Sequence, residues 1–483
     1  MDKSNHIGKK AANITFSKFV VMFISLISGM LLSRFRSLTE YGTYSQIQTI
    51  MNLATTIIMM GLPNSLNYFL AKAETEEERI IFLSNYYSLS TILSLIIGAV
   101  LVTITPLLIT IFDNSLINSF IYFLAFFPWT KIICASIENV LIIYNKTKLI
   151  IFFRISNSLC LLGIILLVQV MSWTFNIYMF LYLVIEVIFT LLTYLIVKNL
   201  VSRIKFLIKP MLIKQIFAFS IPIGLASMIG TINIELDKIV IGSMLGTKEL
   251  AVYTNASKEL PVTIIASSIT AVLLPQMVKF LHVNKVEKAV ELWKSAVTIS
   301  FSIICFLSFA CFVFAPEVIT ILYSKKYLSG VDVFRIYCIV LLLKCTYFGM
   351  LLNAVGKTRF ILYSSICSLI LNLIFNYIFF YLFGFIGPAL ATFVSTLIMQ
   401  LFQLFYSAKV CKISFSKIFP WKNCFLLILL NIFIGIFFYI LNNYLINYIN
   451  SILSSIILGI MWTIIMLIIL YKPLMKEWNN LNK

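Results

Sequence analysis

The chain has 483 residues, of which 61% are hydrophobic and 11% are charged, and its formal net charge is +19. Because a membrane crossing needs about 20 mostly apolar residues, this composition suffices for fourteen crossings and leaves little sequence for a folded extramembrane domain. The positive charge does not indicate nucleic-acid binding, because cytoplasmic loops of membrane proteins also collect Lys and Arg. We therefore predict an all-α polytopic membrane protein.

Apolar runs separated by charged or turn-forming clusters predict fourteen membrane helices. The first six are expected at 13–33, 41–62, 84–111, 117–143, 149–171 and 176–197. The next six are expected at 215–245, 250–275, 295–322, 332–355, 360–382 and 386–408, and the last two at 423–442 and 451–471. The first run resembles a signal peptide, but it ends in Arg34 and Arg36 without a small-residue cleavage site, so we interpret it as a retained span.

The two groups of six helices repeat one another. Pro106-Leu-Leu-Ile-Thr-Ile-Phe112 returns as Pro316-Glu-Val-Ile-Thr-Ile-Leu322, 210 positions later, and Asn145-Lys-Thr-Lys148 returns as Gly356-Lys-Thr-Arg359, 211 positions later. The repeat predicts an N-lobe over 1–205, a C-lobe over 206–410 and a C-terminal helix pair within 411–483. Two similar bundles in a membrane protein indicate transport by alternating access around a site between them.

The distribution of basic residues predicts the orientation. With both termini in the cytoplasm, 27 of the 37 Lys and Arg residues lie at cytoplasmic ends of helices, 6 at outer ends and 4 within spans. This bias agrees with the positive-inside rule. An even number of spans in each repeat makes the two repeats parallel, related by an axis along the membrane normal.

No metal, nucleotide or other cofactor is expected. The nine cysteines lie in apolar segments without a Cys-x-x-Cys pair, so we interpret them as small buried residues. The two histidines, His6 and His282, both occur in polar segments. The Gly356-Lys-Thr358 stretch lacks the earlier glycine of a phosphate-binding loop, because position 351 is Leu351.

Ionisable side chains within spans are candidates for function, because each is costly in a membrane unless it faces a partner or a wet cavity. Nine such residues are predicted, namely Lys131, Glu138, Glu186, Glu235, Asp237, Lys238, Lys258, Glu259 and Lys344. The repeat places Lys131 and Lys344 at similar depths near the middle of the bilayer, one in each half. Two ammonium groups facing a cleft repel each other unless an anion lies between them, so this pair predicts a site for an anionic substrate.

Structural alternatives apply to each of these charges. Another protein group can neutralise Lys131, and Glu138 lies seven residues away on the same helix face. The charges around 235–259 can form ion pairs that hold two helices together, and Glu235 and Lys238 are spaced for such a pair. Glu186 is either a protonated buried acid or a coupling carboxylate. Arg34 is either an interfacial anchor or part of a cationic rim that receives the substrate headgroup.

The arrangement of six, six and two helices resembles the polysaccharide-repeat-unit flippases of bacteria, within the multidrug/oligosaccharidyl-lipid/polysaccharide transporter superfamily. The resemblance is carried by Phe219-Ser-Ile-Pro222, Leu236-Asp-Lys-Ile-Val-Ile-Gly242, Pro316-Glu-Val-Ile-Thr-Ile-Leu-Tyr323 and Asn353-Ala-Val-Gly-Lys-Thr358. It implies two lobes around a cationic cavity that moves an undecaprenyl-pyrophosphate-linked oligosaccharide between leaflets. The substrate-binding residues are then expected to be Lys131, Lys344, Lys238, Lys258 and Arg34, with Glu138, Glu186, Glu235, Asp237 and Glu259 in charge pairing or coupling.

Further expectations follow from this resemblance. The protein is expected in the bacterial inner membrane, in contact with membrane lipids and beside the polymerase and chain-length proteins of an O-antigen or capsule pathway. A lipid II flippase shares the fold and stays an alternative. A multidrug exporter is disfavoured because residues 13–33 lack the acidic coupling residue usual in the first helix. A membrane polymerase normally needs a sizeable outer loop, so we expect a transporter rather than an enzyme.

Overall fold

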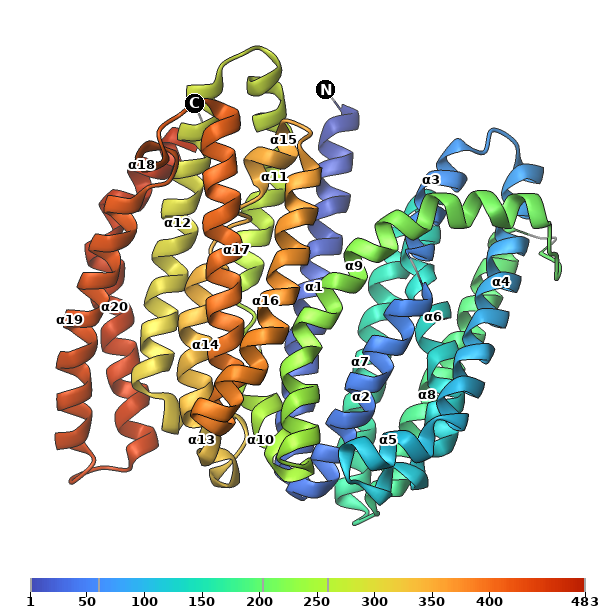
Figure 1. Cartoon of the computed structure of the whole chain (residues 1–483), viewed down its shortest axis with the longest axis horizontal. Coiled ribbons are helices and arrows are strands. Elements are labelled where there is room, and N and C mark those ends of the chain that lie inside the picture. The colour runs from blue at the N-terminus through green and yellow to red at the C-terminus, as the bar shows by residue number, and fades with distance from the viewer. Residues whose placement is uncertain (1, 60, 202–203, 259, 482–483) are drawn as a thin grey trace. The chain divides into compact units, whose positions relative to one another are not determined.

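A computed structural model describes residues 2–59, 61–201, 204–258 and 260–481 (Figure 1). Within these ranges every regular element is a helix and no strand occurs. Nine helical stretches of the described chain are long and apolar enough to cross a membrane, or ten with the bent pair of segments between Pro210 and Met244. One of the nine, Thr358–Cys411, contains two successive helices. Helices occupy all fourteen predicted positions, so the prediction of an all-α polytopic membrane protein is confirmed.

The helices of the first repeat follow one another along the chain with short connections. They are α1 (Asp2–Phe35), α2 (Leu38–Met59), α3 (Leu62–Lys72), α4 (Glu76–Thr103), α5 (Thr105–Phe112), the 3-10 helix η1 (Ser115–Phe120), α6 (Ile121–Ile143), α7 (Thr147–Val170) and α8 (Phe175–Leu200). Short α5 and η1 connect the ends of the long helices α4 and α6.

The second repeat has a matching order of elements. It consists of α9 (Pro210–Met244), α10 (Thr247–Ala256), α11 (Thr263–His282), α12 (Val286–Val313), α13 (Ala315–Leu322), η2 (Lys325–Gly330), α14 (Val331–Leu343), α15 (Met350–Ala354), α16 (Thr358–Phe383), η3 (Gly384–Ile386) and α17 (Gly387–Cys411). Short α18 (Phe415–Ile418) then leads to the C-terminal helices α19 (Trp421–Leu445) and α20 (Ser451–Leu481).

The repeat is visible in the lengths of the helices. Helices α4 and α12 both have 28 residues, α5 and α13 both have 8, and η1 and η2 both have 6. Each of these pairs starts 210 positions apart. Both α5 and α13 carry a proline in the first turn, Pro106 and Pro316, where the missing N–H removes no intrahelical hydrogen bond. The prediction of two similar six-helix repeats is confirmed.

The chain divides into two compact units, one ending at Ala251 and the other beginning at Val252. Helix α9 opens the second repeat but packs on α2 and α3 within the first unit. The border between the compact units therefore differs from the lobe border predicted at 205/206, which marks the sequence repeat. In each unit the long helices run side by side, as in a helical bundle (Figure 1).

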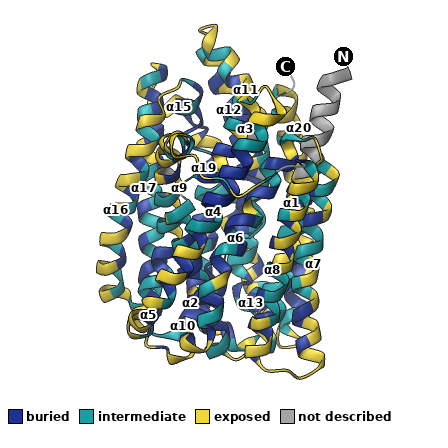
Figure 2. Ribbon diagram, turned by 90° about the vertical axis from the view of Figure 1, so that its right-hand side faces the viewer, coloured by how far each residue is buried: buried dark blue, intermediate teal, exposed yellow. Residues whose placement is uncertain are grey.

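Helix α16 shows the reversed polarity of a helix that faces lipid. Its buried residues are polar and spaced by four, namely Ser364, Ser368, Asn372 and Asn376. Its exposed residues are mostly hydrophobic, including Tyr363, Ile366, Ile370, Leu373 and Ile374. In Figure 2, exposed residues accordingly occur along the outer side of α16. The expectation that all cysteines are buried is wrong for Cys160 and Cys367, because both lie on exposed faces of membrane helices.

The seam between α16 and α17 holds those polar residues. Gln403 Nε2 on α17 donates to Ser364 Oγ at 2.8 Å, and Ser368 Oγ donates to the Ser395 carbonyl oxygen at 3.4 Å. Hydrophobic contacts between helices gain little where lipid tails are equally apolar, so such hydrogen bonds and close packing hold membrane helices together.

Gly98 on α4 lies against the backbone of α6 at Ala125. A Cβ added there would stand 2.0 Å from the Ala125 carbonyl oxygen. We expect Gly98→Ala to lower the free energy of unfolding by about 1–3 kcal/mol, because a rigid backbone must move to admit the methyl group. Thermal unfolding in detergent measures the loss, with Gly163→Ala as the control, since no atom lies within 4 Å of the position of its added Cβ. Equal melting temperatures for the two variants would contradict this packing.

Candidate functional site

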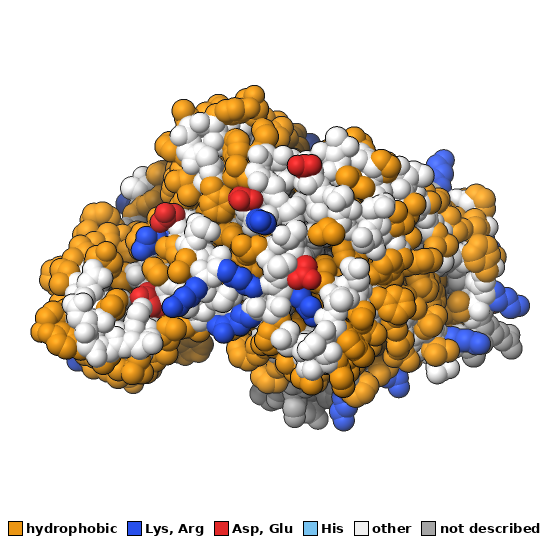
Figure 3. Space-filling model, turned by 90° about the horizontal axis from the view of Figure 1, so that it is seen from below, with side chains coloured by type: hydrophobic (Ala, Val, Ile, Leu, Met, Phe, Trp, Pro, Cys, Tyr) orange, Lys and Arg blue, Asp and Glu red, His pale blue; other side chains and the backbone are white. Residues whose placement is uncertain are grey.

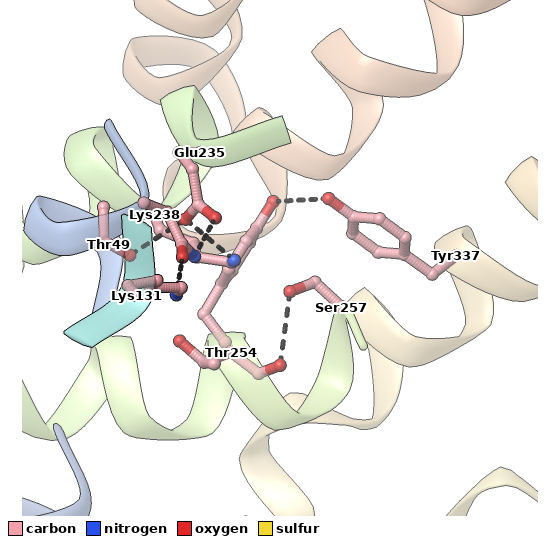
Figure 4. A network of polar contacts seen from close by, with 9 residues as sticks. Thr49, Lys131, Glu235, Lys238, Thr254, Ser257 and Tyr337 are labelled. Atoms are coloured by element: carbon pink, nitrogen blue, oxygen red, sulfur yellow. Dashed lines mark hydrogen bonds and ion pairs between the residues drawn. The ribbon is translucent and has the colours of Figure 1, made fainter. Parts of the chain in front are cut away.

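A network of polar side chains joins three helices of the first unit (Figure 4). Glu235 on α9 is its centre and is only 4% exposed. Its carboxylate accepts hydrogen bonds from Thr49 Oγ1 at 3.0 Å, from Asn52 Nδ2 at 2.9 Å and from Lys238 Nζ at 2.9 Å. Lys131 on α6 donates to Asn52 Oδ1 at 2.8 Å. The network thus connects two ammonium groups through one buried carboxylate and one amide.

The local sequence explains how these side chains meet. Thr49 and Asn52 are three residues apart on α2, and Glu235 and Lys238 are three apart on α9, so each pair lies on one helix face. Helices α2 and α9 pack along their length. A buried carboxylate is costly unless it is paired and hydrogen-bonded. Donors from both helices meet this need of Glu235 and join α2 to α9.

Lys131 is held differently from Lys238. Its ammonium group donates to a neutral amide and lies 5.4 Å from the centre of the Phe127 ring. Glu186 and Glu235 attract it electrostatically. Among the described residues no carboxylate oxygen lies within salt-bridge distance of Lys131, whereas Lys238 forms a direct ion pair with Glu235. An anion can therefore approach Lys131 in exchange for one hydrogen bond to an amide.

Glu138 belongs to a separate cluster. Its carboxylate pairs with Arg154 of α7 and, at 3.3 Å, with Lys18 of α1. In the structure, two basic side chains therefore neutralise Glu138, as the structural alternative for this residue expects. Glu186 on α8 accepts a hydrogen bond from Asn157 Nδ2 of α7 at 3.4 Å.

The remaining predicted residues of the first unit lie elsewhere. Asp237 is 2% exposed on α9. Arg34 is exposed in the last turn of α1, and the neighbouring Arg36 donates to the Trp173 carbonyl oxygen at 3.1 Å. The end of the molecule at the bottom of Figure 1 presents scattered charged side chains, and hydrophobic side chains cover its flanks (Figure 3). The role of Arg34 in substrate binding stays a prediction.

The second unit brings Lys258 and Lys344 to one narrow pocket. Phe334, Tyr337 and Leu341 of α14 also line it. The enclosed space is about 20 Å³, enough for a single water molecule. The four predicted lysines therefore occur as two pairs, one in each compact unit. Glu259 lies outside the described residues.

Both lysines of this pair lie at breaks in helices that were predicted to be continuous. Helix α10 ends at Ala256 and α11 begins at Thr263, so the expected span 250–275 is interrupted next to Lys258. Pro261 explains this interruption, because proline lacks an N–H and restricts the residue before it. Helix α14 ends at Leu343, and α15 begins only at Met350, so Lys344 begins the break in the expected span 332–355.

Side chains of neighbouring helices satisfy the backbone at the second break. Ser300 Oγ of α12 donates to the Cys345 carbonyl oxygen at 2.6 Å, and Gln400 Nε2 of α17 donates to the Leu343 carbonyl oxygen at 2.6 Å. Trp293 Nε1 donates to Thr346 Oγ1 at 3.2 Å. Irregular backbone within a membrane protein persists where protein groups satisfy it or where it lines a cavity. In transporters such breaks mark binding sites.

We expect Ser300→Ala to lower the free energy of unfolding by about 1–3 kcal/mol, because it leaves the buried Cys345 carbonyl group without its side-chain donor. Ser302→Ala is the matched control. Ser302 is equally buried on the same helix, and its hydroxyl donates only to the Thr298 carbonyl oxygen one turn away. Thermal unfolding in detergent compares the two, and a control that loses as much stability would contradict the role of Ser300.

Several partners in these clusters were not predicted from the sequence. Asn52 connects Lys131 to Glu235, Thr49 donates a hydrogen bond to Glu235, and Arg154 and Lys18 neutralise Glu138. The signal available for Asn52 and Thr49 is the group of polar residues Gln46, Gln48, Thr49 and Asn52 within the predicted membrane span 41–62. Arg154 and Lys18 each lie five residues from the expected cytoplasmic end of a predicted span, 149–171 or 13–33, so the count of charges places them at cytoplasmic ends rather than within spans.

The fold and the intramembrane charges define a multi-pass membrane protein with two helical repeats, and comparisons with known proteins give its family. A family model described as polysaccharide biosynthesis protein matches residues 7–281, and the MatE family model matches residues 222–378. The first match covers more than half of the chain, so the protein belongs to the polysaccharide biosynthesis protein family. The resemblance found in the sequence is confirmed. No curated protein matches the chain.

Solved structures show the same fold. The chain is similar to a lipid II flippase MurJ in an inward closed conformation, with a TM-score of 0.77 and 16% identity over 96% of this chain and 99% of that one. It is similar to an inward-facing multidrug resistance MATE family transporter, with a TM-score of 0.65 and 17% identity over 82% and 96%. A third similar structure is a MOP superfamily transporter from Pyrococcus furiosus, with a TM-score of 0.54 and 14% identity over 84% of this chain and 96% of that one.

Proposed function

We propose that this protein is a flippase that moves an undecaprenyl-pyrophosphate-linked oligosaccharide repeat unit from the inner to the outer leaflet of the bacterial cytoplasmic membrane. Its product would serve the synthesis of O-antigen, capsule or exopolysaccharide. Membership of the polysaccharide biosynthesis protein family supports the pathway. The repeat of two helical bundles supports transport by alternating access.

One observation supports a substrate with an anionic headgroup. Lys131 lies on a membrane helix and donates its hydrogen bond to the neutral amide of Asn52. Pyrophosphate oxygens form stronger, charge-assisted hydrogen bonds to an ammonium group than an amide oxygen does. The substrate can therefore replace Asn52 as the acceptor. Lysine suits this task because its compact charge and three donors bind phosphate without a fixed geometry.

In the proposed cycle, Lys131 and Lys238 of the first compact unit and Lys258 and Lys344 of the second bind the pyrophosphate in an inward-open state. The lobes then rock, and the headgroup leaves toward the rim that includes Arg34, while the lipid tail stays in the bilayer. Glu235 would form its ion pair with Lys238 again when the substrate leaves. Glu186, Asp237 and Glu259 are the proposed coupling carboxylates. Both termini are proposed to be cytoplasmic.

Reconstitution into vesicles tests this proposal. Purified protein should move an undecaprenyl-pyrophosphate-linked oligosaccharide to the opposite leaflet, where a membrane-impermeant glycosidase cleaves the sugar. A neutral glycolipid with the same sugar but no phosphate should stay uncleaved. Movement of lipid II alone would assign the lipid II function that the MurJ structure carries. Movement of neither lipid would contradict the proposal and leave drug export as the function to test.

A further inference from the structure

A second cavity of the second unit is lined by none of the four lysines. It is a largely open surface pocket with a volume of about 600 Å³. Lys294 of α12 lines it from one side, and Ser416, Trp421, Lys422 and Asn423, at and before the start of α19, line it from the other. This volume lies in the range of small-molecule sites. The cavity is at the end of the second unit where α18 lies, at the top of Figure 1.

The groups around this cavity favour an anion. Lys294 and Lys422 supply two ammonium groups, and Ser416 and Asn423 supply polar side chains. Among the described residues no Asp or Glu lines the cavity, and neither lysine forms a salt bridge there, although Glu291 is exposed one turn before Lys294. Helix α19 starts without a side-chain cap, so the N–H groups of its first turn add to the positive potential.

Aromatic contacts hold the wall of the cavity in place. The Trp421 and Phe419 ring centres are 4.8 Å apart, and the Trp421 and Phe415 ring centres are 5.4 Å apart. Trp421 Nε1 donates to the Phe415 carbonyl oxygen at 3.2 Å. Phe419 is buried and its ring also contacts those of Trp293 and Phe348. Tryptophan at such a position is typical of the boundary between headgroups and acyl chains.

An apolar stripe leads away from the cavity along α19. Phe425, Leu429 and Phe433 follow at intervals of four residues, so they lie on one helix face. They are 61%, 45% and 77% exposed. A free phosphate ion gains nothing by contact with this apolar stripe, whereas an acyl chain can pack on it. The combination of a cationic cavity, an interfacial tryptophan and an adjacent apolar stripe therefore fits a phospholipid.

We propose that this cavity binds the phosphate headgroup of an anionic phospholipid from the adjoining leaflet, with an acyl chain along the exposed stripe of α19. Lys294 and Lys422 contact the phosphate from two helices, so the bound lipid joins the C-terminal helix pair to α12. Basic pockets between membrane helices bind anionic headgroups in this way. None of the lysines proposed for the transported substrate lines this site.

Native mass spectrometry of the purified full-length protein tests the site. Wild-type protein should bind phosphatidylglycerol at least tenfold more tightly than phosphatidylcholine, because phosphatidylglycerol has a net negative charge, whereas the choline cation neutralises the phosphate and is repelled by the two lysines. The double substitution Lys294→Ala with Lys422→Ala should reduce this preference about tenfold. The control is Lys412→Ala with Lys417→Ala, which removes the same charge from exposed positions that do not line the cavity.

Three results would overturn the proposal. One is unchanged binding in the Lys294 and Lys422 double variant, and another is an equal loss in the control variant. The third is displacement of phosphatidylglycerol by millimolar inorganic phosphate, which would identify a site for a soluble ion. Because the measurement is binding of a phospholipid rather than transport, its outcome is independent of the proposed flippase activity. Melting temperatures of both double variants exclude misfolding as the cause.

Discussion

Replacing Lys131 with methionine is expected to reduce transport of the lipid-linked oligosaccharide about 10- to 100-fold without loss of folded protein. The proposed contact between this ammonium group and the pyrophosphate is a hydrogen bond between charged groups, worth about 1.5–3 kcal/mol, and each 1.4 kcal/mol corresponds to about tenfold in binding. Folding should survive, because the structural partner of Lys131 is the neutral Asn52, whose other hydrogen bond, to Glu235, remains. Vesicle transport and the melting temperature are the two readouts.

Lys146→Met is the control for the loss of charge. Lys146 is exposed in the turn before α7, so its removal should leave transport unchanged. Lys344→Met tests the second repeat in the same way and is expected to match Lys131→Met. Normal transport in the variants of Lys131, Lys344, Lys238 and Lys258 would contradict the assignment of these lysines to the substrate.

Glu235→Ala is expected to cause a loss of folded protein rather than a selective loss of transport. The substitution leaves Lys238 as a largely buried ammonium group without its carboxylate, and it removes the acceptor of Thr49 and Asn52. Breaking a buried ion pair by removal of one partner costs about 3–5 kcal/mol. This is a large part of the total stability of a protein of this kind. The yield of folded protein in membranes and its melting temperature measure the effect.

A second substitution separates the ion pair from other effects. Glu235→Ala with Lys238→Met should regain much of the lost stability, because no unpaired charge is then left on α9. Lys238→Met alone should cost less than Glu235→Ala, since Thr49 and Asn52 still donate to the carboxylate. Additive losses in the double variant would show that the pair is not coupled and would contradict the central place of Glu235 in the network.

The fold could be predicted from the sequence because apolar runs and their repetition determine where membrane helices form. The match between α4 and α12, 210 positions apart, follows directly from the repeated Pro106 and Pro316 segments. Contacts between helices were harder to predict from the sequence. The spacing of Glu235 and Lys238 indicates a pair within α9, but nothing in the spacing places Asn52 of α2 between Lys131 and Glu235.

The helix break at Lys344 is a second feature that could not be predicted from the sequence. The expected span 332–355 reads as continuous because Cys345, Thr346, Tyr347 and Phe348 contain neither proline nor a charge that would end a helix. The break is held by Ser300 and Gln400, which are 45 and 57 residues away in the sequence. Tertiary hydrogen bonds of this kind override local helix preference and leave no mark in the local pattern.

The most direct test is the fate of the lipid-linked repeat unit in a bacterial strain that lacks this gene. The account predicts that repeat units accumulate on the inner leaflet, that surface polymer is lost, and that the wild-type gene restores both while the Lys131→Met gene does not. Repeat units that reach the outer face but stay unpolymerised would contradict a flippase and indicate a polymerase. Unchanged pools on both leaflets would also contradict the account and return attention to drug export.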